Sequence, residues 1–170
     1  MNRLNIYPVA EAEPKSAHYR VLVNGRESGV YTSYRFDPGN YQKRIAGRPV
    51  SDVSFTAFDF EGEVTIEIYL ETEPTEQVAV RPLKLGINPI TDGKKISFKI
   101  DKPANFSVEP YGTFCPLHIF ANPMESEVPD KNDPKVHYFP AGVHEIDPIK
   151  LKDGETVYLE GGAFVYAKPQ

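Results

Sequence analysis

The chain has 170 residues, a formal net charge of −5 and a sequence pI near 5.4. An acidic chain offers no electrostatic footprint for DNA or RNA, so we expect no nucleic-acid partner. The 16 prolines and 12 glycines favour a loop-rich β fold, and 40% hydrophobic residues suffice for a packed core. No apolar run is long enough for a signal peptide or a membrane span, so we expect a cytoplasmic chain without a membrane partner, or a secreted one if a leader was removed.

The N-terminal part of the sequence predicts short β-strands over residues 4–7, 19–23 and 29–36. Asn24-Gly25 is a hairpin signal between the last two. Residues 37–49 contain two glycines, two prolines and several cations, and are expected to form a loop.

Two alternating stretches follow, over residues 53–57 and 64–70, joined by the turn Glu61-Gly62. Alternation of apolar and polar residues is typical of strands with one buried face, and we expect an antiparallel hairpin here. The residues expected in the core are Ile66, Ile68, Ile96 and Phe98. Those expected on the outer surface are Glu67, Lys95 and Lys99.

Further short strands are expected over residues 78–80, 83–85, 95–100, 105–109 and 117–121, at a spacing typical of a β-sandwich. The polar, proline-bearing stretch after them reads as a linker. We therefore predict an all-β protein with an antiparallel β-sandwich over residues 1–122 and a linker over residues 123–135.

The last part, residues 136–170, has a different rhythm. Its β-rich runs cover residues 136–139, 143–146, 149–151, 156–159 and 163–166, with turn signals at Asp153-Gly154 and Gly161-Gly162. Strands this short with a turn every few residues suit a coil of parallel strands, in which each run forms one side of a rung. This stretch therefore predicts the opening strands of a parallel β-helix.

The sequences VHYFPAGVH (residues 136–144) and GETVYLEGGAFVYA (residues 154–167) resemble the runs that open the right-handed parallel β-helix of polygalacturonase-like glycoside hydrolases (family twenty-eight) and the related dextranases. The segments DGKKISFKIDKPANFSVEP and LHIFANP resemble the β-sandwich that precedes this pectin-lyase-like helix. The resemblance implies an N-terminal accessory domain of a hydrolase of carbohydrate metabolism, which caps and supports the β-helix.

Polygalacturonases hydrolyse by inversion, which requires paired carboxylates that admit a water molecule. In the family these stand in Asn-Thr-Asp, Asp-Asp and Gly-His-Gly motifs, with Arg-Ile-Lys for the substrate carboxylate. None of the four occurs here. No catalytic residue is carried over, and we expect no cofactor, no metal and no hydrolysis by this chain alone.

A loop rich in aromatic residues and cations is the strongest candidate for ligand binding. Aromatic rings stack on sugars and arginine pairs with carboxylates, a combination that suits an acidic oligosaccharide. A stand-alone carbohydrate-binding module is therefore the alternative function. The competing interpretation is that the rings are strand core and the cations a solvated loop. The residues concerned are Tyr31, Tyr34, Arg35, Tyr41, Arg44 and Arg48.

Other clusters have simpler interpretations. His137 and His144 could form a metal site with Glu145, but surface or turn-packing histidines are the favoured interpretation. The cluster of Asp59, Glu61 and Glu63 reads as a solvated hairpin tip rather than an acid pair. The single cysteine, Cys115, is expected to be a small half-buried filler.

The strand expected over residues 163–166 raises a question of pairing. If no further rung follows, its outer backbone groups are unpaired, and edges of this kind recruit another chain. We therefore expect either a downstream β-helix domain or self-association through this C-terminal edge.

Overall fold

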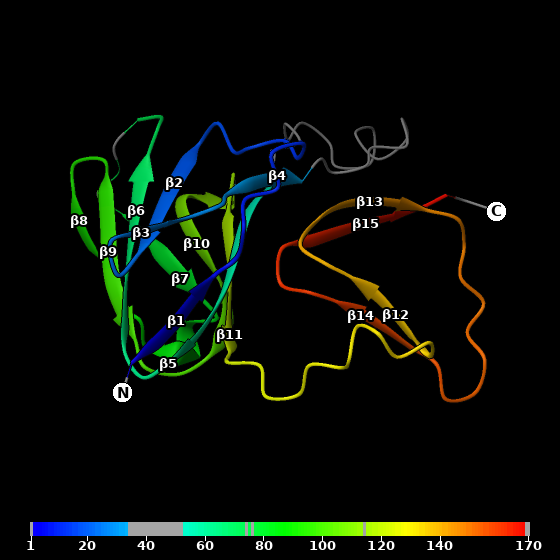
Figure 1. Ribbon diagram of the computed structural model, residues 1–170. Coiled ribbons are helices and arrows are strands. Elements are labelled where there is room, and N and C mark those ends of the chain that lie inside the picture. Colours follow the sequence, from blue (N-terminus) through cyan, green and yellow to red (C-terminus); the bar gives the residue numbers. More distant parts are fainter. Residues whose placement is uncertain (1, 34–52, 74, 76, 114, 169–170) are drawn as a thin grey trace.

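The computed structural model describes residues 2–33, 53–73, 75, 77–113 and 115–168. In this part of the chain the secondary structure is β-strand except for one turn of 3-10 helix, which confirms the all-β fold class. None of its helices has the length and apolarity that crossing a bilayer requires. The strands form two large sheets and, beside them, a separate C-terminal unit (residues 136–167; Figure 1).

The two large sheets enclose one hydrophobic core. The five-stranded sheet has the order β3 (Arg26–Ser28), β2 (Tyr19–Val23), β6 (Val64–Leu70), β9 (Lys95–Ile100), β8 (Ile90–Asp92). The six-stranded sheet has the order β1 (Arg3–Ile6), β5 (Val53–Glu61), β11 (Leu117–Pro123), β10 (Ala104–Thr113), β7 (Ala79–Arg81), and β4 (Tyr31–Ser33) also pairs with β5.

The predicted core residues are confirmed. Ile66, Ile68 and Ile96 are 0% exposed and Phe98 is 5% exposed. Their alternating partners face outward, as the strand period requires. Lys99 is exposed, but Glu67 and Lys95 are half-buried rather than exposed, because they form an ion pair.

The hairpin expected around Glu61-Gly62 is wrong. β5 and β6 belong to different sheets: β5 pairs with β1, β4 and β11, whereas β6 pairs with β2 and β9. Phe58 and Phe60 of β5 and Val64 of β6 all lie in the shared core, so the turn carries the chain from one wall of the core to the other. In β5 the buried face is moreover the one that carries Ser54 and Thr56, both 0% exposed, whereas Phe55 on the other face is half-buried. Over residues 53–57 alternation therefore predicted neither the partner strand nor the buried face.

Three smaller expectations also need correction. Residues 83–85 form a 3-10 turn, η1 (Leu83–Leu85), not a strand, since Pro82 precedes it and Leu83 is 68% exposed. The strand expected over residues 29–36 starts only at Tyr31, as β4, and residues 34–36 lie outside the described residues. The run 149–151 makes no strand, because Pro148 and the Asp153-Gly154 turn flank a short corner.

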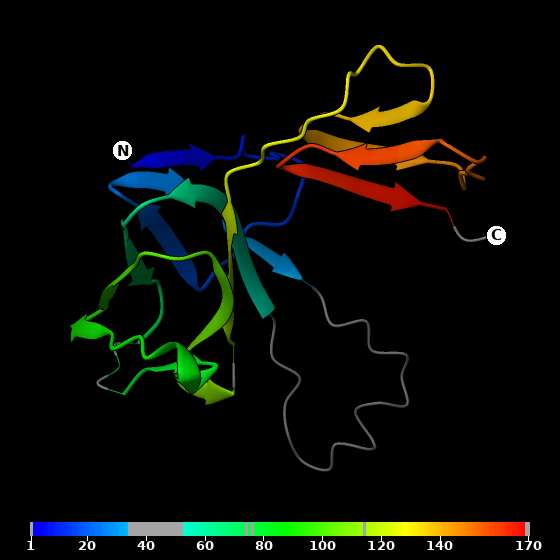
Figure 2. The ribbon, with the colours of Figure 1, turned by 90° about the horizontal axis from the view of Figure 1, so that it is seen from below.

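The C-terminal unit consists of two pairs of parallel strands. β12 (Val136–Phe139) pairs with β14 (Thr156–Leu159), and β13 (Gly142–Ile146) pairs with β15 (Ala163–Ala167). Each pair therefore joins a strand to the second strand after it in the sequence. Figure 2 shows the two pairs next to each other, apart from the two large sheets.

Two glycines expected at the corners of the C-terminal unit play different roles. Gly162 has φ +91°, the left-handed backbone conformation that favours glycine. Gly161 instead lies flat against the ring of Tyr7, where an added Cβ would be 2.3 Å from Tyr7 Cε1. This corner is therefore where the C-terminal unit contacts the rest of the chain.

Candidate functional site

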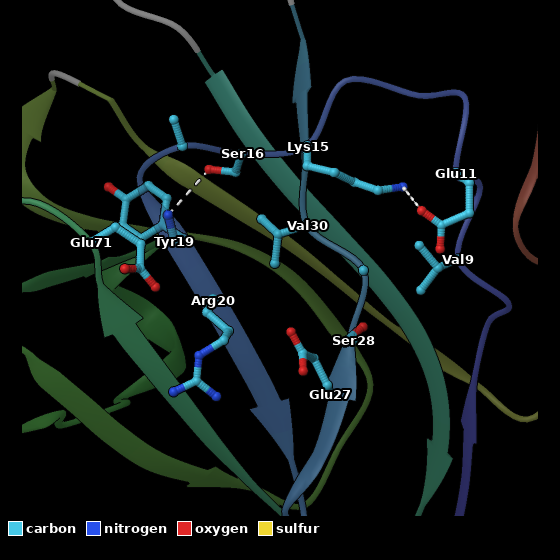
Figure 3. Close-up of a pocket in the computed structure, with 12 residues that line it drawn as sticks. Val9, Glu11, Lys15, Ser16, Tyr19, Arg20, Glu27, Ser28, Val30 and Glu71 are labelled. Atoms are coloured by element: carbon cyan, nitrogen blue, oxygen red, sulfur yellow. Dashed lines mark hydrogen bonds and ion pairs between the residues drawn. The ribbon is translucent and has the colours of Figure 1, made fainter.

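A groove of about 640 Å³ lies between β2, β3 and the N-terminal segment that precedes them (Figure 3). Its floor is formed by buried residues, among them Tyr19, Ser28 and Val30. The Ser28 hydroxyl lies 2.8 Å from that of Thr56, so it is engaged within the fold. The groove is shaped by strand β2, which buries alternate residues and turns the others outward.

The rim of this groove carries charges of both signs. The Arg20 guanidinium lies over the ring of Tyr69, 4.3 Å from its centroid. Among the described residues, neither it nor the carboxylates of Glu27 and Glu71 makes a hydrogen bond or ion pair. Figure 3 shows Arg20 and Glu27 near each other in the groove, with Glu71 at one end beside Tyr19. Such a rim can offer both donors and acceptors to a polar ligand.

Chemical catalysis has less support in this groove. The described lining residues include neither a histidine nor a cysteine. Its lysine, Lys15, lies 3.9 Å from Glu11 and also donates to the Ala10 carbonyl.

The predicted ligand loop can be followed only at its start. Tyr31 is 8% exposed, and its hydroxyl accepts a hydrogen bond from the Ala10 N–H at 2.9 Å. Its ring lies 4.9 Å from that of Phe164 and 5.6 Å from that of Phe55. The other five residues, Tyr34, Arg35, Tyr41, Arg44 and Arg48, lie outside the described residues, and the acidic-sugar site stays a prediction.

The aromatic contacts of Tyr31 form one half of the junction between the large sheets and the C-terminal unit. Phe164 of β15 packs against Tyr31 of β4 and Phe55 of β5, around a hollow of about 150 Å³. The Tyr166 hydroxyl donates to the Glu13 carboxylate at 2.7 Å. β15 is thus held by apolar contacts to the six-stranded sheet and by a hydrogen bond to the segment between β1 and β2.

The other half of the junction is a polar network around Asp59, a carboxylate that is 7% exposed. The Tyr7 hydroxyl donates to Asp59 Oδ1, and the Asn5 amide donates to Oδ2 at 3.0 Å. Asn122 donates to the Tyr7 hydroxyl at 3.3 Å. Since the Tyr7 ring also packs on Gly161, this network positions the ring that supports the C-terminal unit.

Burial raises the pKa values of Tyr7 and Tyr19 well above that of an ordinary tyrosine. For Tyr7 the causes are burial and then the hydrogen bond to Asp59, and for Tyr19 burial comes first. In the unfolded chain both would ionise near pH 10. Above that pH the unfolded state therefore binds fewer protons than the folded state.

We expect the free energy of unfolding to fall as the pH rises above about 10, by up to about 1.4 kcal/mol per pH unit for a fully buried tyrosine. Urea unfolding between about pH 8 and 11 measures this slope, and it should be flatter in Tyr19→Phe and Tyr7→Phe. Ultraviolet titration of the folded protein that shows both hydroxyls ionising at ordinary pH would contradict the prediction.

The remaining candidate clusters do not come together. His137 Nε2 lies 3.5 Å from Glu155 without a hydrogen bond, whereas His144 Nε2 lies 2.7 Å from the Pro140 carbonyl oxygen. Across the described residues, no three histidine, cysteine, aspartate or glutamate side chains gather as metal ligands do. Cys115 is half-buried, and its carbonyl accepts a hydrogen bond from Tyr19.

The expectation of a solvated acidic tip is wrong for Asp59, which is buried under Tyr7. Glu61 pairs with Arg3, and Glu63 pairs with Lys99 at 2.7 Å. The three carboxylates thus have separate partners. The sequence showed no sign of the Asp59 network, since its donors stand far away at the N-terminus.

The outer edges of β14 and β15 are a further feature of interest. Among the described residues, β14 pairs only with β12 and β15 only with β13. The N–H groups of Thr156 and Glu160 donate toward β12, and that of Lys168 donates toward β13. Because donors alternate in direction along a strand, those of Val157 and Val165 point to the open side.

Comparisons with known proteins identify the fold alone. No protein-family model matches the chain, and no curated protein matches it in sequence. Among solved structures, Dex49A from Penicillium minioluteum is similar, with a TM-score of 0.65 and 19% sequence identity. The similarity covers 95% of this chain but 44% of that one, so this chain spans less than half the length of its structural relative. The chain therefore shares an all-β fold with part of Dex49A.

Proposed function

We propose that this chain is a non-catalytic accessory unit of a carbohydrate-active glycoside hydrolase. In this proposal the two large sheets are a β-sandwich that covers and supports a right-handed parallel β-helix, and β12–β15 are the opening strands of that helix. The observation that carries the proposal is the in-register parallel pairing of β12 with β14 and of β13 with β15.

The physical need for such a unit follows from the strand edges. One or two rungs of a coil bury little apolar surface and leave backbone groups unpaired, so they are marginal by themselves. Here the six-stranded sheet contacts the coil through Tyr7 at Gly161 and through Tyr31 at Phe164. These contacts favour an arrangement in which the two-sheet unit supports the C-terminal unit from one side.

The type of hydrolase is inferred from two sources. The similarity to the dextranase Dex49A supports an accessory role in a glycoside hydrolase. The motifs of residues 136–144 and 154–167 resemble polygalacturonase-like enzymes as well, and the finer family is part of the proposal. The absence of all four catalytic motifs from the sequence supports a role without chemistry.

We expect the purified chain to self-associate through the open edges of β14 and β15. In this association, strands of a second copy pair with these edges in the place of the next rung. The double substitution Val157→Pro and Val165→Pro should abolish this association, because proline removes the two N–H groups that point outward and leaves the donors toward β12 and β13 in place. Light scattering over a range of concentrations measures the change.

The control keeps the backbone donors. Val157→Ala together with Val165→Ala trims the same side chains but should still associate. A parent chain that stays strictly monomeric, with residues 156–166 strongly protected from hydrogen exchange, would overturn the proposal, because the two-sheet unit alone would then satisfy the segment.

A further inference from the structure

The outer face of the six-stranded sheet carries ordered rows of side chains. Across the strands, Phe55, His118 and Ser107 stand in register, and Arg81 of β7 continues the row. In the adjacent row, Phe120 of β11 stands beside Asn105 of β10. The Phe55 end is covered by Phe164 of the C-terminal unit. At the other end of the row, Ser107 of β10 lies beside Arg81 of β7.

An aromatic ring is exposed at this end. Phe120 is 39% exposed on a strand whose neighbouring residues, Ile119 and Ala121, are buried on the other side. It lines a hollow of about 370 Å³ together with Arg81, Asn105 and His118. Ligand sites in proteins commonly occupy about 300–1,000 Å³, so the hollow is large enough for a small ligand.

The polar groups around the ring are available for a ligand. Among the described residues, the side chains of Asn105 and His118 make no hydrogen bond to the rest of the fold. The Arg81 guanidinium uses its Nε to donate to Glu109 at 2.9 Å, and its terminal nitrogens remain as further donors on a side chain that is 53% exposed. Together these three side chains can donate and accept hydrogen bonds beside one apolar ring.

The face is also held in shape by a carboxylate on the same side of β10, that of Glu109. The Glu109 side chain is 11% exposed and accepts hydrogen bonds from Arg81 and from the Ser107 hydroxyl, each at 2.9 Å. A paired guanidinium keeps one orientation, which lowers the entropy that a ligand must remove on binding. The pairing also compensates the positive charge of Arg81.

We infer that this face binds a neutral oligosaccharide, with one sugar ring stacked on Phe120. The apolar C–H face of a sugar needs an aromatic surface, and its hydroxyls need both donors and acceptors, which the ring and the Asn105, His118 and Arg81 side chains supply. A neutral ligand is favoured over an acidic one because the one cation of the hollow is already paired with Glu109.

The site shares no lining residue with the groove beside β2. It also does not depend on the supporting role proposed above. A chain that associates through β14 and β15 without binding sugar, or that binds sugar as a monomer, would separate the two inferences.

The test is titration of the purified chain, followed by NMR, with isomaltohexaose, maltohexaose, cellohexaose and, as the acidic comparison, hexagalacturonate. At least one neutral hexaose should shift the amide signals of Asn105, Ser107, His118 and Phe120. Phe120→Ala should weaken binding by about tenfold or more, since truncating an aromatic anchor commonly costs that much. Asn105→Ala should weaken it by about threefold to tenfold.

The matched control is Ile90→Ala, which removes another exposed apolar side chain, 71% exposed, from β8 of the other sheet. It should leave affinity unchanged. Because Phe120 faces outward, thermal unfolding of Phe120→Ala should show that the fold is retained. No binding of any neutral hexaose by the parent chain, equal affinity in folded Phe120→Ala, or binding of hexagalacturonate alone would each overturn the inference.

Discussion

Replacement of Phe98 by alanine is expected to lower the free energy of unfolding by about 3–5 kcal/mol. Phe98 is 5% exposed and lies on β9 of the five-stranded sheet. Its ring lies 5.8 Å from that of Phe106, on β10 of the opposite sheet, at an interplanar angle of 67°. Truncation would therefore remove an edge-to-face contact across the core and leave a cavity that neither sheet can close alone.

Urea unfolding of the parent chain and the variant measures this cost. Lys99→Ala is the matched control on the same strand, since Lys99 pairs with Glu63 at an exposed position and should contribute less than about 1 kcal/mol. A double-mutant cycle with Phe106→Ala isolates the ring–ring contribution. A cost for Phe98→Ala below about 1 kcal/mol would place the ring outside the core.

Phe98 also illustrates what alternation in the sequence predicts well. A strand has a side-chain period of two, so the apolar residues of β6 and β9 had to share one face, and that face had to be buried. A separate local signal, the dipeptide Asn24-Gly25, predicted the turn after β2, where Asn24 has φ +49° and Gly25 φ +74°. The strand that pairs with β2 after this turn is β3 and not the expected stretch over residues 29–36. Local chemistry therefore sufficed for these strands, their faces and this turn.

Strand pairing required information that no local pattern carries. β5 lies parallel to β11, which comes much later in the chain, and not antiparallel to β6, which follows it directly. The buried face of β5 carries Ser54, Thr56, Phe58 and Phe60, so the alternation of residues 53–57 did not indicate this arrangement. The choice depends on how all the strands pack around the core, and no single stretch of the sequence specifies that packing.

The candidate sites show the same difference between what local sequence predicts and what tertiary contacts decide. Phe120 belongs to a recognisable strand, but its exposure depends on what covers the outer face of the sheet. Asp59 reads as a surface acid between Phe58 and Phe60, and only Tyr7, brought over it by the pairing of β1 with β5, makes it a buried acceptor. The roles of both residues were therefore set by tertiary contacts, which alternation does not reveal.

Asp59→Ala is expected to lower the free energy of unfolding by about 2–3 kcal/mol and to loosen the C-terminal unit. The substitution would leave the half-buried Tyr7 hydroxyl without its acceptor, and an unsatisfied buried polar group costs about 1–3 kcal/mol. The Asn5 amide also loses its bond, but it is exposed and can turn to water. Since Tyr7 packs on Gly161, movement of its ring would propagate to β14 and β15.

Two measurements are needed, because a change in total stability and a change at the junction are different outcomes. Urea unfolding gives the first, and hydrogen exchange over residues 136–167 gives the second.

Glu61→Ala is the control, since this neighbouring carboxylate pairs with Arg3 at a position where both side chains are more than half exposed, 58% and 56%. The substitution should cost less than about 1 kcal/mol. Tyr7→Phe removes the donor instead of the acceptor and should raise exchange in the same residues. If Asp59→Ala lowers stability but leaves exchange over residues 136–167 unchanged, the network stabilises the six-stranded sheet alone, and Tyr7 does not couple that sheet to the C-terminal unit.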